Sequence, residues 1–121
     1  MVATCIRALP DEGCGLLIGT DEGAVVEVVA SVNVAASAKV YEVDSRVLLR
    51  ASHRADDLGL NIIGVFHSHT HTEAYPSPTD VAQAPDPAWH YVLVSLRDVP
   101  VVVRSYRIMD GDVTSEDIVG Q

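Results

Sequence analysis

Aromatic residues are scarce in this sequence, because Phe, Trp and Tyr together make up 5% of its 121 residues. A core without aromatic bulk must be filled mainly by Val, Leu, Ile and Ala, and a hydrophobic content of 48% is enough to form one. The chain contains no internal repeat, low-complexity tract or linker. Since its length also lies in the range of single domains, residues 1–121 are expected to form one domain.

Positive charge is also in short supply. The chain has 8 Lys and Arg residues against 17 Asp and Glu residues, so its formal net charge is −9 at pH 7. It lacks the basic cluster that binds a phosphate backbone, and an anionic membrane surface would repel it for the same reason. Nucleic acids and membranes are therefore not expected as partners. The acidic residues are scattered along the chain, which favours a solvated surface.

The sequence has only two cysteines, Cys5 and Cys14, and their spacing matches no metal-binding motif. Two cysteines are too few for a disulfide scaffold, and the first residues show no signal-peptide pattern. No apolar run approaches the roughly 20 residues that span a bilayer. A reducing, cytoplasmic location is therefore expected, with both thiols buried as small hydrophobic groups.

Hydrophobic periodicity predicts an α/β domain with a mixed sheet and two main helices. The first helix ends at Pro10, which cannot continue it, and the second lies between an N-cap at Asp44 and a stop at Gly59. The expected helices are 2–9 and 45–59; the expected strands are 14–20, 24–31, 38–44, 60–67, 89–96 and 99–108. The apolar run 60–67 should be a central strand buried on both faces, and Asp110-Gly111 is a turn signal.

The stretch "HSHTHTEAYPSPTD", residues 67–80, contains the residues best suited to chemistry. Side chains at positions i and i+2 of a strand share one face, so His67 and His69 can offer two imidazole nitrogens to one ion. A catalytic zinc site has three protein ligands and leaves the fourth position to water. A carboxylate from the following helix is a natural third ligand.

The end of the same stretch also has a purely structural interpretation. Ser77, Pro78 and Asp80 form an ordinary helix N-terminus, in which Ser77 is the N-cap and Asp80 lies three residues after it. Asp80 then satisfies that end of the helix and its dipole. On the local pattern alone, this interpretation of Asp80 is favoured over metal binding.

Three further histidines have weaker claims. His71 continues the i, i+2 series and could replace Asp80 as the third ligand, but the chain is expected to leave the strand before it. We therefore assign His71 to a loop near the substrate. His53 lies among polar residues of a predicted helix and should be solvated, and His90 precedes a strand and should be structural.

All the spacings together resemble one family. His67-x-His69, seven further residues and then Ser77-x-x-Asp80 is the signature of JAMM (MPN+) metallopeptidases, and "PDEGCGLLIG" looks like the segment with their catalytic glutamate, here Glu12. The resemblance implies a mixed, mostly antiparallel sheet with flanking helices, in a cytidine-deaminase-like arrangement. It implies one Zn²⁺ bound by His67, His69 and Asp80, with Glu12 as general base and Ser77 stabilising the oxyanion. Without the family, Glu12 is equally well a solvated acid.

Within the family, the chain is most similar to bacterial peptidases of sulfur metabolism, which free cysteine from the carboxyl end of a ubiquitin-like sulfur carrier protein. The stretches that carry this resemblance are "HSHTHTEAYPSPTDV", "HYVLVSLRD" and "RSYRIMDGDVT". The resemblance implies hydrolysis of the bond after a C-terminal Gly-Gly tail, which would enter a groove as an added strand. We expect His71 and Tyr75 to line that groove.

Two other functions stay open at this point. A general deconjugase, an isopeptidase for small ubiquitin-like modifiers, would share every catalytic residue. A non-catalytic MPN interaction module would lack part of the ligand set, which this chain keeps. The sequence also leaves open the carrier, a native metal other than zinc and the oligomeric state, a homodimer included.

Overall fold

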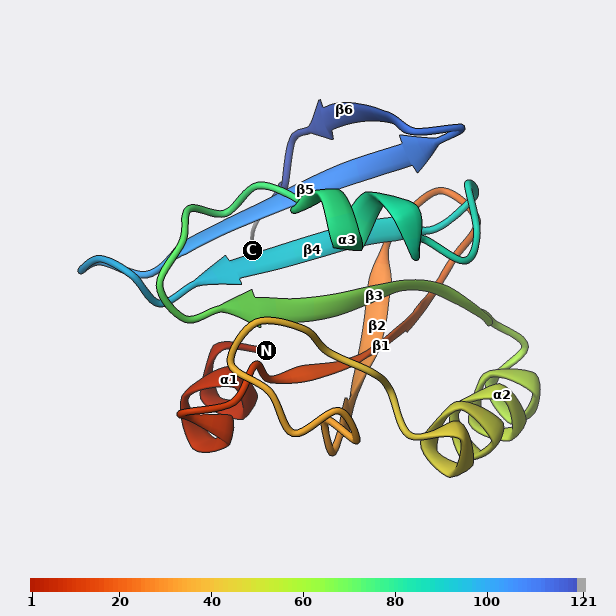
Figure 1. Ribbon diagram of the computed structural model, residues 1–121. Coiled ribbons are helices and arrows are strands. Elements are labelled where there is room, and N and C mark those ends of the chain that lie inside the picture. The colour runs from red at the N-terminus through yellow and green to blue at the C-terminus, as the bar shows by residue number, and fades with distance from the viewer. Residues whose placement is uncertain (120–121) are drawn as a thin grey trace.

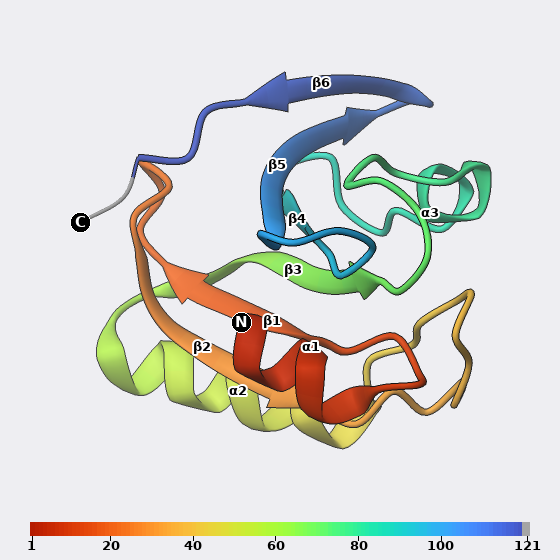
Figure 2. The same ribbon diagram turned by 90° about the vertical axis from the view of Figure 1, so that its left-hand side faces the viewer.

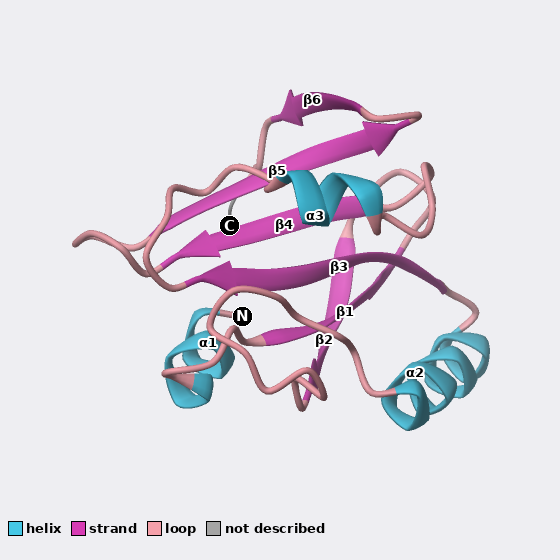
Figure 3. Ribbon diagram, in the orientation of Figure 1, coloured by secondary structure: helices cyan, strands magenta, loops and turns pink. Residues whose placement is uncertain are grey.

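A computed structural model describes residues 1–119 and shows a six-stranded sheet with three helices beside it (Figures 1 and 3). In chain order, the elements are α1 (Val2–Ala8), β1 (Cys14–Gly19), β2 (Val25–Ser31), α2 (Ser45–Leu58), β3 (Asn61–His69), α3 (Pro78–Ala82), β4 (His90–Ser95), β5 (Val102–Met109) and β6 (Asp112–Glu116). Among the described residues, no helix has the length and hydrophobicity needed to cross a lipid bilayer.

The sheet has the order β2-β1-β3-β4-β5-β6, which places β3 and β4 in its middle. Every neighbouring pair is antiparallel except β3 and β4, which run parallel. The predicted α/β class, with a mixed and mostly antiparallel sheet, is therefore confirmed. In the register, Cys14 of β1 lies opposite His67 of β3, so the start of β1 meets the end of the central strand.

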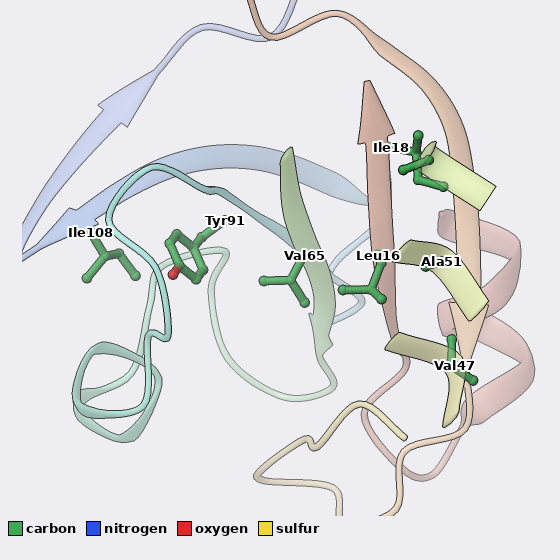
Figure 4. Close-up of a cluster of buried hydrophobic side chains, with 8 residues drawn as sticks. Leu16, Ile18, Val47, Ala51, Val65, Tyr91 and Ile108 are labelled. Carbon is green, nitrogen blue, oxygen red and sulfur yellow. The ribbon is translucent and has the colours of Figure 1, made fainter. Parts of the chain in front are cut away.

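Alternation along β1 divides the hydrophobic core between the two faces of the sheet. On one face, Leu17 packs with Phe66 and with Cys5 of α1. The other face carries the cluster of Figure 4, which extends from α2 to β5 and comprises Leu16, Ile18, Val47, Ala51, Ala55, Val65, Tyr91 and Ile108. Burial of each large aliphatic side chain contributes about 1.5–3 kcal/mol to stability. Helices α1 and α2 therefore hold the β1 side of the sheet from opposite faces, and both free cysteines are buried as predicted.

Helix α2 begins and ends as the local sequence predicts. The Asp44 side chain accepts a hydrogen bond from the Arg46 N–H at 2.8 Å, and Gly59 ends the helix in the left-handed conformation, with φ 68°. Val47, Ala51 and Ala55 face the core, as their spacing requires. Figure 2 shows α2 beside β1 and β2, away from β5 and β6.

The prediction of a strand over 38–44 is wrong. Residues 32–44 form an irregular loop whose only β-type pairing is a single bridge between Asn33 and Val43. Alternation in "AKVYEVD" satisfied the strand pattern, but the backbone groups there bond to side chains and to other loops instead of to a neighbouring strand. Ser37 and Val40, for example, both accept hydrogen bonds from the Asn33 amide.

The sequence predicts the turn before β6 but not β6 itself. Asp110 and Gly111 both have positive φ, at 51° and 83°, and they join β5 to β6 as a tight hairpin with Met109 opposite Asp112. The short β6 carries mostly polar residues and lies at the sheet edge, so its hydrophobic pattern is too weak to indicate a strand. Its formation depends on pairing with β5.

Candidate active site

Three side chains converge at the end of β3. His67 and His69 both lie in this strand, and Asp80 comes from the first turn of α3. The Asp80 Oδ2 lies 3.2 Å from the Nε2 of His67 and 3.0 Å from the Nε2 of His69. One ligand atom from each residue lies within 4.8 Å of the other two, and all three side chains are buried. The structure thus unites the two histidines and the carboxylate.

The orientation of His69 is set by a backbone carbonyl. Its Nδ1 lies 2.8 Å from the carbonyl oxygen of Glu73, in the loop that leads to α3. Because a carbonyl only accepts, Nδ1 carries the proton, and the lone pair of the neutral ring stays on Nε2, which faces Asp80. This is the tautomer that a metal ligand requires. Burial opposes the charged imidazolium, but the bonds to Asp80 and Glu73 outweigh it and raise the pKa of His69.

His67 is held by an aromatic ring instead. Tyr41 stacks on it with ring centroids 4.0 Å apart and an angle of 16° between the planes. Within the described residues, neither ring nitrogen of His67 has a hydrogen-bond partner, because the 3.2 Å approach to Asp80 lacks hydrogen-bond geometry. Burial lowers the pKa of His67, so the ring is neutral near pH 7 and its nitrogens can bind a cation.

Asp80 belongs to the helix cap and to the cluster at the same time. The Ser77 Oγ accepts the Asp80 N–H at 3.1 Å, and the Asp80 Oδ2 accepts the Ser77 N–H at 2.9 Å, which completes a capping box. Burial would raise the pKa of the Asp80 carboxyl, but its interactions with His67, His69 and the Ser77 N–H outweigh burial and hold that pKa well below its usual range. The structural and the metal-binding interpretations of this segment are therefore compatible.

Glu12 is buried close enough to the cluster to interact electrostatically with His69 and Asp80. Glu12 is 3% exposed, and its Oε1 has no hydrogen-bond partner among the described residues. Burial raises the pKa of the Glu12 carboxyl from 4.5 to about 7, with a smaller lowering by His69 and a raising by Asp80. Glu12 is therefore not the solvated acid that its local sequence allows. A carboxyl with a pKa near neutrality can both take up and release a proton.

The backbone beside Glu12 is tied directly to the end of β3. The Gly13 N–H donates to the Ser68 Oγ at 2.7 Å, and the Ser68 N–H donates to the Gly13 carbonyl at 3.0 Å. The start of β1 cannot move relative to His67 and His69 without breaking these bonds. A Cβ atom at Gly13 would lie 2.6 Å from the Cys5 Cα, so α1 fits against this position only because it is glycine.

The donor set fits a small divalent metal ion. Two neutral imidazoles and a carboxylate are ligands that zinc accepts, and tetrahedral ligands about 2.0–2.1 Å from zinc lie about 3.3 Å apart. The separations of 3.0 and 3.2 Å from Asp80 Oδ2 to the two imidazole nitrogens are close to that value. The unpartnered, buried nitrogens of His67 also need a binding partner. The cluster is therefore suited to hold a metal.

The remaining candidates lie outside this cluster. His71 is exposed in the loop after β3, with Nδ1 2.8 Å from the Thr70 Oγ1, and Tyr75 is 49% exposed with its ring against that of Tyr106. His53 is exposed on α2. His90 lies at the start of β4, where its Nδ1 is 2.6 Å from the Glu116 carboxylate, in keeping with a structural role.

Sequence reasoning missed two contributors to the site. Tyr41 lay in a segment interpreted as a strand, and the carbonyl of Glu73 has no side-chain signature. The scarcity of aromatic residues is the one signal that could have drawn attention to Tyr41. Nothing local in the sequence indicates that its ring would cover His67.

Comparison with known proteins identifies the family. The family model described as prokaryotic homologs of the JAB domain matches residues 1–109. The chain belongs to the prokaryotic JAB family. Since this is the JAMM domain, the resemblance indicated by His67-x-His69 and Ser77-x-x-Asp80 is confirmed at the level of the family.

Several relatives of the chain have named activities. The CysO-cysteine peptidase of Mycobacterium tuberculosis (strain H37Rv) is 43% identical over 120 residues, which cover 98% of this chain and 82% of that protein. A desampylase of Haloferax volcanii is 33% identical over 71% of this chain and 63% of its own length. The chain is thus a homologue of JAMM peptidases, and the predicted likeness to those of sulfur metabolism is confirmed.

A solved structure supports the fold. The solution structure of a protein from Desulfitobacterium hafniense matches 98% of this chain and 84% of its own, with 35% identity and a TM-score of 0.89. The similarity includes nearly the whole chain, so the fold that positions the His67, His69 and Asp80 cluster is shared with that protein.

Proposed function

We propose that this protein is a zinc peptidase that hydrolyses the bond after the C-terminal Gly-Gly of a ubiquitin-like sulfur carrier and releases cysteine or a short extension. The 43% identity over nearly the whole chain to a CysO-cysteine peptidase carries this proposal. The convergence of His67, His69 and Asp80 beside the buried Glu12 supports a hydrolytic mechanism. The two free, buried cysteines are compatible with a reducing, cytoplasmic setting.

His67, His69 and Asp80 would hold the zinc ion, as two neutral imidazoles and one ionised carboxylate. When bound at such a site, zinc acts as a Lewis acid and lowers the pKa of water, so that hydroxide is available at neutral pH. The protein must keep both imidazoles neutral and in the correct tautomer. Burial favours the neutral form of His67, and the Glu73 carbonyl fixes the His69 tautomer in which Nε2 is left for the metal.

Glu12 would act as the proton carrier of the reaction. As a carboxylate it takes a proton from the attacking water, and as a carboxylic acid it then gives that proton to the amine of the leaving residue. A pKa of about 7 suits both steps, because neither protonation state is then costly to reach near neutral pH. The apolar packing around the start of β1 holds this pKa above that of a solvated glutamate.

Ser77 would stabilise the oxygen that gains negative charge at the attacked carbonyl. Its Oγ accepts the Asp80 N–H, and its hydroxyl proton stays available for donation. The N-cap fixes the position of that hydroxyl relative to Asp80, so the donor is already oriented before charge develops. His71 and Tyr75, both exposed in the loop between β3 and α3, would line the groove for the Gly-Gly tail.

A general deconjugase is the second candidate. It is favoured by the similarity to a desampylase, although the chain covers 63% of that relative. Both functions use the same five residues, so the difference lies in the leaving group: an α-amino acid with a free carboxylate in one case and a lysine side chain in the other. Only the choice of substrate can distinguish them.

A direct test uses zinc-loaded protein and two substrates. One is a sulfur carrier that ends in Gly-Gly-Cys, and the other is the same carrier joined to a lysine ε-amine. We expect loss of one cysteine from the first, read by intact mass, with inhibition by a chelator and recovery on addition of zinc. Faster cleavage of the lysine conjugate would favour the deconjugase instead. Failure to cleave either substrate at one bound zinc per chain would refute both.

A further inference from the structure

The side chain of Asn33 makes an unusually complete set of hydrogen bonds just beyond β2. The residue is 8% exposed. The two N–H groups of its amide Nδ2 are shared among three backbone carbonyls, those of Glu12 at 3.0 Å, Val40 at 3.0 Å and Ser37 at 3.3 Å. Its Oδ1 accepts the N–H groups of Ala35 at 3.1 Å and Glu42 at 2.9 Å. The donors and acceptors of this amide are thus fully used, and all of its partners are backbone atoms.

These bonds organise the loop that was expected to be a strand. Two elements of the site depend on the loop between Asn33 and Glu42. The Glu12 N–H donates to the Ser37 carbonyl at 2.7 Å, and Tyr41 of the same loop stacks on His67. Asn33 therefore bonds directly to the residue that carries the buried carboxyl and, through the loop, orients the ring that covers a ligand histidine.

We propose that Asn33 is a positioning residue of the active site, which holds the backbone of Glu12 and the Tyr41 ring in one frame around His67. The proposal rests on the proposed peptidase function for its kinetic consequence. Asn33 itself does not touch the His67, His69 and Asp80 cluster, so it acts through Glu12 and Tyr41. Its effect should appear as misplacement of these two side chains rather than as loss of a ligand.

Asparagine is well suited to this position. Serine is too short to reach carbonyls on both sides of the loop, so Asn33→Ser leaves several of them without a donor. Aspartate keeps the size and the Oδ1 acceptor, but Asn33→Asp puts an oxygen where Nδ2 now faces three carbonyl oxygens. The two variants therefore remove the same donor in different ways.

Asn61 provides a matched control. It lies at the start of β3, at the opposite end of the strand from His67 and His69, and its Nδ2 donates to the Asp21 Oδ1 at 3.0 Å in an exposed contact. Asn61→Ser makes the same chemical change as Asn33→Ser at a distance from the site. Any general effect of losing an asparagine amide will appear in both variants.

The kinetic test compares zinc-loaded wild type, Asn33→Ser and Asn61→Ser at a temperature where all three are folded. We expect kcat for cleavage of a carrier ending in Gly-Gly-Cys to fall about 10²-fold in Asn33→Ser, with one zinc still bound per chain, because a small misplacement of catalytic groups has effects of this size. Asn61→Ser should keep the wild-type kcat. Wild-type kcat in folded, zinc-loaded Asn33→Ser would overturn the proposal.

A second test needs neither zinc nor substrate. In the zinc-free protein, the ring protons of His67 should have upfield NMR shifts from the stacked Tyr41 ring, and Tyr41→Ala identifies that contribution. Asn33→Ser and Asn33→Asp should remove much of the upfield shift, whereas Asn61→Ser should keep it. Unchanged His67 shifts in both Asn33 variants would refute the positioning role.

The two tests separate this proposal from the proposed function. If wild type cleaves no carrier, the peptidase assignment fails and the His67 shifts alone decide the role of Asn33. If both Asn33 variants are unfolded while Asn61→Ser is folded, Asn33 is required for the fold as a whole, and the specific positioning role is overturned.

Discussion

The ring of Tyr41 lies flat against the ring of His67, with centroids 4.0 Å apart. Tyr41 comes from the irregular loop 32–44 and His67 from the central strand β3, so the contact joins this loop to the middle of the sheet. The stack restricts rotation of an imidazole that has no hydrogen bond to orient it among the described residues. Tyr41 thereby fixes the orientation of the His67 ring, as the Glu73 carbonyl fixes that of the His69 ring.

The first prediction concerns this stack. Tyr41→Ala should weaken zinc binding about tenfold, since groups that orient metal ligands typically have effects of 10–100-fold. Tyr41→Phe keeps the ring and should bind zinc nearly as tightly as wild type. Competition with a chromophoric chelator measures both affinities. Equal affinities in Tyr41→Ala and wild type would mean that packing around His67 holds the ring without the stack.

The second prediction concerns the proton carrier. Glu12→Gln should keep the fold and one zinc per chain but lower kcat by about 10²–10⁴-fold, the usual contribution of general acid–base catalysis. Asp11→Asn is the matched control, because it makes the same change one residue away, and it should retain activity. Peptide cleavage and zinc content are measured on the same samples. Full turnover by Glu12→Gln would remove Glu12 from the mechanism.

The third prediction concerns pH and stability of the zinc-free protein. The folded pKa of Glu12, about 7, lies above its ordinary value of 4.5, so the folded state binds this proton more tightly than the unfolded state. Below pH 4.5, Glu12 is protonated in both states and does not lower the free energy of unfolding. As the pH rises from 4.5 through 7, the free energy of unfolding falls, because the unfolded state loses this proton first. The full loss should reach roughly 3–4 kcal/mol, because the two pKa values of Glu12 differ by about 2.5 and each pKa unit corresponds to about 1.4 kcal/mol.

Urea unfolding of zinc-free wild type and Glu12→Gln at pH 5 and pH 8 measures this loss. The free energy of unfolding of wild type, relative to the variant, should be lower at pH 8 than at pH 5. Because the histidines and Asp80 titrate in both proteins, the difference between the two isolates Glu12. A difference that does not change with pH would show that Glu12 is solvated in the zinc-free protein.

The fourth prediction separates ligands from neighbours. His67→Ala, His69→Ala and Asp80→Asn should each lower zinc content, because each removes a donor from the cluster. His71→Ala should leave zinc content unchanged, since His71 is exposed and bonded to Thr70. Elemental analysis after dialysis gives the stoichiometry. Loss of zinc only in His71→Ala would assign the metal to a different set of ligands.

Local sequence was sufficient to predict those features whose structure depends on a few neighbouring residues. The limits of α2 follow from Asp44 and Gly59, and the cap of α3 follows from Ser77 and Asp80, because a helix end is satisfied within one turn. The strand prediction for 38–44 failed because the structure of this segment depends on residues outside it. Its alternation is a valid strand pattern, but a strand requires a partner, and the loop obtains its hydrogen bonds from the Asn33 side chain.

The sequence by itself determined which residue types are available and which lie on the same strand or helix end, so the motif from His67 to Asp80 and its family could be recognised from spacing alone. Only the tertiary structure decided which distant groups meet them. Gly13 bonds to Ser68 across 55 residues, and burial of the neighbouring Glu12 raises the pKa of its carboxyl. Burial and stacking depend on the packing of the whole chain, whereas spacing depends only on the geometry of one strand or one helical turn.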